Sequence, residues 1–136
     1  MLAEAVKDYV QAHVRASGIR APVNRSRTPD APPQQITITP SGGREPTTEG
    51  AFERPGFRVT CRGRDDAAAE EIADEVDRAF TRAPTPLELG GRWTISMSRA
   101  SQPPGVTAVT EQGWVEYACD YIIEVESRED EQEEAV

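Results

Sequence analysis

The residues with the most reactive side chains are one histidine, His13, and two cysteines, Cys61 and Cys119. A metal site needs several His, Cys or carboxylate ligands at short spacing, and a hydrolytic triad needs a base beside its nucleophile. The cysteines are 58 positions apart, and His13 stands alone on a segment with helical spacing. The sequence therefore predicts no metal site, no cofactor and no catalytic residues, so we expect a protein that is not an enzyme.

Both cysteines fall on the apolar side of segments that alternate like β-strands. In a protein that folds in a reducing cytoplasm, such cysteines are usually buried and reduced. No apolar run approaches the ~20 residues that a membrane-spanning helix needs, and no secretory signal is visible, so we expect a cytoplasmic fold and no membrane. A disulfide and a reactive thiol remain as alternatives for Cys61 and Cys119.

The net charge of −9 speaks against specific binding of nucleic acid, which draws its affinity from basic side chains on phosphates. A glycine-containing stretch, SGGREPTTEG, lacks the spacing of a phosphate-binding loop. Acidic residues are plentiful but fall mainly on the outer face of one predicted helix, on one face of the last strand and at the C-terminus. For most of them a solvated surface is the simplest interpretation.

Basic residues gather on and beside one predicted strand, where Arg58 and Arg62 share a face with Thr60 between them. The strip is either a solvent-facing edge guarded by charge or a docking face for an acidic partner. The even positions of the last strand offer an acidic counterpart, and copies with two such strips can join head to tail into a ring. The candidate interface residues are Arg54, Arg58, Arg62, Arg64, Glu116, Asp120 and Glu124.

The regular elements that position these residues follow from hydrophobic spacing. Three- and four-residue spacing predicts helices over 2–17 and 66–80, the second capped by Asp65 or Asp66. Alternation predicts strands over 34–39, 57–62, 93–98 and 113–126. The order α-β-β-α-β-β indicates an α+β fold, with one mostly antiparallel four-stranded sheet and two helices packed on it.

The domain organisation follows from the segments between these elements. Residues 1–126 are expected to form a single domain with a long polar loop at 41–55, of the kind that orders on assembly. Residues 127–136 carry five acids and one arginine and no apolar spacing, which is typical of a disordered acidic tail.

Three stretches together resemble a known family: QQITITPSGG, RPGFRVTCRGRDDAAAEEIADEVDRAF and YACDYIIEVE. Their order and texture over residues 2–126 are similar to the minor capsid and tail terminator proteins of long-tailed bacteriophages. In that family a strand ends in an arginine–glycine step before an alanine-rich helix, as at Arg62-Gly63 here. The acidic tail departs from the pattern.

The resemblance implies a structural virion protein without catalytic residues, assembled in the host cytoplasm and located at the head–tail joint. It implies a ring, typically a hexamer, that caps the tail tube and presents it to the head–tail connector or stopper protein. DNA would pass through such a ring, so its inner wall should be acidic or neutral. That wall could come from the even face of the last strand or from the helix acids Glu70, Glu71, Asp74, Glu75 and Asp77. Another neck protein, for head completion or stopping, and a cellular adaptor domain remain as alternatives.

Overall fold

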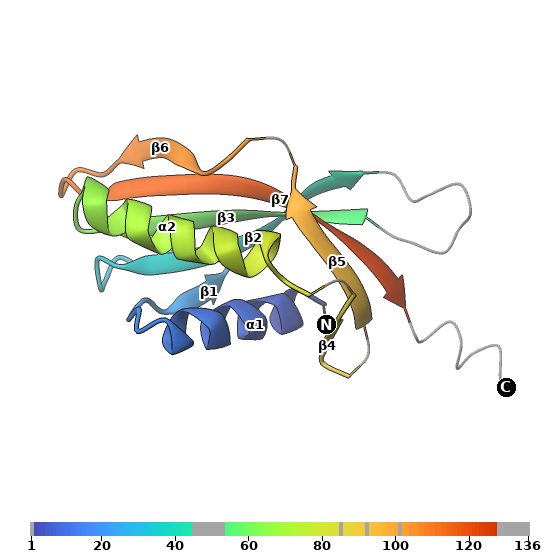
Figure 1. The fold of residues 1–136 in the computed structure, drawn as a ribbon. Coiled ribbons are helices and arrows are strands. Elements are labelled where there is room, and N and C mark those ends of the chain that lie inside the picture. The colour runs from blue at the N-terminus through green and yellow to red at the C-terminus, as the bar shows by residue number, and fades with distance from the viewer. Residues whose placement is uncertain (1, 45–53, 85, 92, 101, 128–136) are drawn as a thin grey trace, which may run out of the picture.

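The computed structural model describes residues 2–44, 54–84, 86–91, 93–100 and 102–127. Within them lie two helices and seven strands (Figure 1). The helices are α1 (Leu2–Ala16) and α2 (Asp66–Thr81). The strands are β1 (Val23–Arg25), β2 (Gln35–Arg44), β3 (Arg54–Gly63), β4 (Leu87–Leu89), β5 (Trp93–Arg99), β6 (Gly105–Val109) and β7 (Val115–Ser127).

All seven strands belong to one mixed sheet, so the expectation of a four-stranded, mostly antiparallel sheet is wrong. The order is β1-β2-β3-β7-β5-β4, and β6 pairs with β7 off this path. β1 runs parallel to β2, and the other pairs are antiparallel. The missed strands β1, β4 and β6 have three to five residues, too few for an alternating pattern to stand out. The α+β class and the two helices are as expected.

β7 is the central strand and changes neighbours along its length. One of its edges pairs with β3 over residues 115–122. Its other edge pairs first with β6 over 115–118 and then with β5 over 121–127. In Figure 1 the sheet curls accordingly, since β5 and the end of β7 turn away from the β2–β3 pair.

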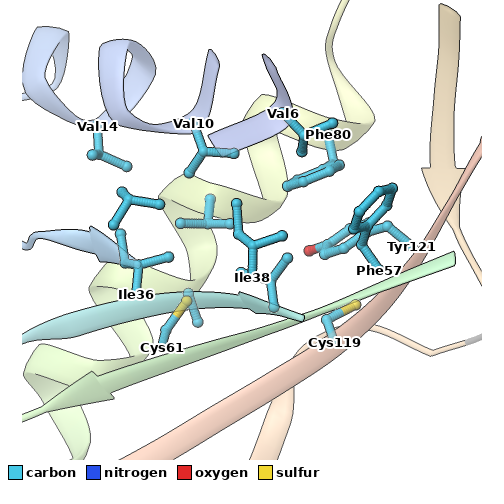
Figure 2. Packing of buried hydrophobic residues seen from close by; sticks show 14 of the residues in the cluster. Val6, Val10, Val14, Ile36, Ile38, Phe57, Cys61, Phe80, Cys119 and Tyr121 are labelled. Carbon is cyan, nitrogen blue, oxygen red and sulfur yellow. The ribbon is translucent and has the colours of Figure 1, made fainter. Parts of the chain in front are cut away.

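Both helices cover the same face of the sheet, with α1 on β1 and β2 and α2 on β3 and β7. Val6, Val10 and Val14 point from α1 into the core, toward Ile36 and Ile38 of β2 (Figure 2). All five side chains are fully buried, as their helical and alternating spacing predicts.

The β3–α2 junction requires the glycine at its centre. A Cβ atom on Gly63 would lie 2.3 Å from the backbone nitrogen of Ala69, so no other residue fits without moving the helix. Asp65 then caps α2 by accepting a hydrogen bond of 2.8 Å from the Ala68 backbone N–H. This close approach explains why a glycine ends β3 before the alanine-rich helix α2.

The two cysteines are buried, free and on the helix-covered face of β3 and β7, as predicted. Burial raises the pKa of the Cys61 thiol, which keeps it protonated.

The β2–β3 pair is longer than the sequence suggested. The strand expected to end at Pro40 continues to Arg44, and β3 already begins at Arg54. Both ends of the segment 41–55 are therefore strand. The rest of that predicted loop, and all but the first residue of the predicted acidic tail, lie outside the described residues.

Candidate interaction surfaces

The helix-free face of the sheet carries the basic and acidic strips, and it brings them together within one subunit. Arg58 lies directly opposite Asp120 in the β3–β7 register, and Arg62 lies opposite Glu116. The Arg58 guanidinium donates two hydrogen bonds to Asp120, from Nε to Oδ1 at 3.0 Å and from Nη2 to Oδ2 at 3.2 Å. Hydrogen bonding to Asp120 raises the pKa of Arg58. The basic charge on β3 and the acidic charge on β7 therefore partly neutralise each other within one copy of the chain.

The Arg58–Asp120 pair remains open to a partner. Its side chains are 55% and 40% exposed, so water screens the attraction and the pair contributes little to folding. The two residues also line a groove of 230 Å³, together with Thr107 and Ala118. A charged pair beside a groove can exchange its internal partner for an external one at small cost.

Arg62, by contrast, is buried and has an internal role. Its guanidinium donates to the backbone carbonyls of Pro29, Pro32 and Pro33 at 2.8 Å each, and stacks 4.7 Å from the Trp114 ring centre. These contacts hold the proline-rich segment before β2 against the helix-free face. Nothing in the spacing of the strip distinguished Arg62 from Arg58.

The other predicted interface residues do not form one continuous strip. Arg64 and Glu124 are exposed, and they lie near opposite ends of the sheet. Arg54 and Glu116 are half-buried. Of the seven candidates, the structure brings together Arg58 and Asp120 as an exposed pair.

A second Arg–Asp pair, which the sequence did not reveal, has its carboxylate buried in the domain and its arginine, Arg99, at the surface. Asp77 was expected on the solvent face of its helix, and this is wrong: it is 7% exposed. Its Oδ1 accepts hydrogen bonds from Tyr121 Oη at 2.7 Å and Arg99 Nε at 2.9 Å, and Arg99 Nη2 binds its Oδ2. Tyr121 also stacks on Phe80, with ring centres 4.1 Å apart (Figure 2).

These contacts set the protonation of the buried cluster. Burial alone would raise the pKa of Asp77, but hydrogen bonds from Arg99 and Tyr121 outweigh it and lower the pKa below its ordinary value. Burial and the bond to Asp77 raise the pKa of Tyr121. The cluster is thus an ionised carboxylate held by a cation and a neutral phenol, and it ties α2 to β5 and β7.

His13 and Ser17 of the α1 end meet Glu75 of α2, which assembles the three residue types of a hydrolytic triad. His13 Nε2 lies 3.2 Å from Glu75 Oε1, and the Ser17 hydroxyl donates to the same oxygen at 2.6 Å. The hydrogen bond from Ser17 is the largest cause of the lowered Glu75 pKa. Because the serine donates to the carboxylate and not to the imidazole, the histidine is not placed to activate it. The cluster joins the two helices.

The outer face of α2 is an exposed acidic surface formed by Glu70, Glu71 and Asp74. Glu71 and Asp74 have no ion-pair partner among the residues that the structure describes. Asp77 and Glu75, which share this helix, are engaged internally.

Over the described ranges, no three metal-binding side chains come together, and neither helix could cross a membrane. The described residues form two charged faces, one on each side of the sheet. Exposed charged faces are surfaces that a subunit of an assembly can offer to other proteins.

Comparison with known proteins identifies that subunit. The model of the bacteriophage tail terminator protein family matches residues 6–127, so the chain belongs to this family. It is accordingly a structural virion protein that associates with other virion proteins. A comparison with curated proteins finds no match.

Two solved structures share the fold. A chain in the virion of a native gene transfer agent particle is 16% identical, with a TM-score of 0.58 over 92% of this chain and 94% of that one. A second solved chain is 19% identical, with a TM-score of 0.52 over 92% and 90%. At these identities the likeness shows the architecture, namely a curled sheet with both helices on one face.

Proposed function

We propose that the protein forms a closed ring, hexameric as the family resemblance implies, that caps the finished tail tube and joins it to the head connector. The family match over residues 6–127 carries this proposal, because it covers all seven described strands, all of α2 and α1 from residue 6 onward. The role calls for binding surfaces and not for chemistry, so we propose a protein without enzymatic activity. Residues 1–126 then form one assembly domain with an acidic tail.

The acidic face of α2 supports a passage for DNA. A basic wall would bind phosphates and hold the genome in place, whereas an acidic wall repels them and permits transit. The exposed carboxylates of Glu71 and Asp74 suit such a wall. Arg58, on the opposite face of the sheet, then points away from the passage, toward a contact with another subunit or the connector.

The test uses the purified chain and the particle that encodes it. Light scattering over a wide concentration range, with and without tail tubes, should show a closed oligomer in at least one condition. Particles that lack the protein should accumulate DNA-filled heads and unjoined tails in the electron microscope. A chain that stays monomeric throughout, or a deletion that leaves heads joined to tails, would refute the proposal.

A further inference from the structure

The helix layer leaves one border of the sheet uncovered. α1 covers β1 and β2, α2 covers β3 and β7, and β6 extends the sheet beyond α2 (Figure 1). Val106 and Val109 lie opposite Tyr117 and Val115 of β7, so they project on the helix-covered face. They are 55% and 64% exposed, and are the exposed large apolar side chains of the described residues.

This border, formed by β6 and the adjacent side of α2, has little protection against pairing. Charged residues and prolines usually keep an edge strand from pairing with another chain, and the strand GVTAV contains neither. Acidic groups flank it. Glu70 approaches Tyr117, the residue opposite Val106, and the exposed Glu111 follows the strand in the turn to β7. A partner for this border therefore needs an apolar recess beside positive charge.

The opposite border of the same sheet offers such a recess. A groove of 470 Å³ lies where the end of α1 meets the chain leading into β1, and Ile19, Ala21, Pro22 and Pro32 supply its apolar lining. Arg15 and Arg20 also line it. Both arginines are exposed and have no ion-pair partner within the described part of the chain.

We infer that the β6 border of one copy binds the α1–β1 groove of the next, with Val106 and Val109 in the recess and Arg15 and Arg20 facing Glu70 and Glu111. One surface offers exposed apolar side chains beside acids, and the other an apolar-lined recess beside arginines. They lie at opposite borders of one sheet, so the contact is head to tail and repeats around a ring. The inference rests on the proposed ring and names the surfaces that close it.

Charge reversal at the two borders tests the contact. Glu70→Arg with Glu111→Arg makes both borders basic, and Arg15→Glu with Arg20→Glu makes both acidic. Asp74→Arg and Arg82→Glu, at exposed positions outside the two borders, are the controls. Sedimentation velocity of the full chain, under the conditions in which the wild type assembles, measures the concentration for half-assembly. All changed side chains are exposed, so melting temperatures should confirm that every variant folds.

Each double variant alone should need at least about tenfold more protein to assemble, because like charges then face each other. An equimolar mixture of the two double variants should assemble again, with the variants alternating around the ring. Val109→Asp should also weaken assembly, and mixing it with either double variant should not restore it. If the double variants assemble like their controls, the inference is wrong and the ring stands. If the wild type itself never assembles, the ring proposal fails first, independently of these borders.

Discussion

The protein contains two Arg–Asp pairs of the same chemistry in two different settings. Arg99 binds Asp77 under α2, and Arg58 binds Asp120 on the helix-free face, each through two guanidinium nitrogens. The Asp77 side chain is 10% exposed, whereas that of Asp120 is 40% exposed. The same pairing therefore serves different ends, since the pair with the buried carboxylate ties α2 to the sheet and the exposed pair remains available to a partner.

The difference follows from what each carboxylate would lose without its cation. Asp77 is surrounded by α2, β5 and β7, so its unpaired charge would face protein and not water. Asp120 would simply be hydrated. A pair whose carboxylate is buried is costly to break even where its net contribution is small, and an exposed pair is cheap to break. Mutations at Asp77 should therefore mainly lower stability, and mutations of the Arg58–Asp120 pair should mainly affect assembly.

The largest effect is expected from Asp77→Ala. It leaves the Tyr121 hydroxyl and the partly buried Arg99 without their acceptor, so stability should fall by about 2–3 kcal/mol. Urea unfolding followed by tryptophan fluorescence measures the loss. Asp120→Ala is the matched control and should cost under about 1 kcal/mol. If Asp77→Ala and Asp120→Ala lowered stability equally, burial of the carboxylate would not distinguish the two pairs.

The protonation of Asp77 gives the second prediction. Its pKa is lower in the folded chain than in the unfolded chain, so its stabilising effect is complete above about pH 4 and is lost as pH falls through the folded value. Asp77→Asn cannot titrate. The wild type should be more stable than this variant at neutral pH. The difference in stability between the two should become smaller in acid. Thermal unfolding from neutral pH to about pH 2.5 checks this, with the exposed variant Asp74→Asn measured alongside.

Tyr121→Phe separates the hydrogen bond from the charge. It removes one donor to Asp77 and keeps the ring stacked on Phe80, so we expect a loss of about 1 kcal/mol. When Asp77→Asn is added to Tyr121→Phe, the stability lost through Asp77→Asn should still become smaller in acid, because Arg99 still binds the carboxylate of Asp77. A loss as large as that of Asp77→Ala would show that the phenol and not the cation holds the cluster.

Much of the fold was predictable because long elements repeat their pattern. The valines at three- and four-residue spacing in α1 and the odd positions of β7 identified the core, and the cysteines followed from the same alternation. The short strands β1, β4 and β6 could not be read this way. They are defined by backbone pairing with distant strands, and β6 is exposed throughout.

The candidate site was predictable only in outline. The alternation placed Arg58 and Arg62 on one face, but what covers that face depends on the path of the proline-rich segment 29–33, which has no period to read. Asp77 looked like one more acid on a charged helix. Asp77 is buried because Arg99 of β5 and Tyr121 of β7 pack against this side of α2. Such tertiary contacts cannot be read from the spacing of residues within the helix.

The smallest effect on stability, and a large one on assembly, is expected from Arg58→Glu. Arg62 is left unchanged, since reversing it would break the carbonyl contacts that hold residues 29–33. Loss of the exposed pair should cost under about 1 kcal/mol, although a new carboxylate then faces Asp120. If the helix-free face contacts the connector or a neighbouring subunit, heads should fill with DNA but fail to join tails. Arg82→Glu makes the same charge change at the end of α2 and should join normally. Normal joining by Arg58→Glu would mean that this arginine belongs only to a solvated face of β3, which is paired on both edges and needs no guarding charge.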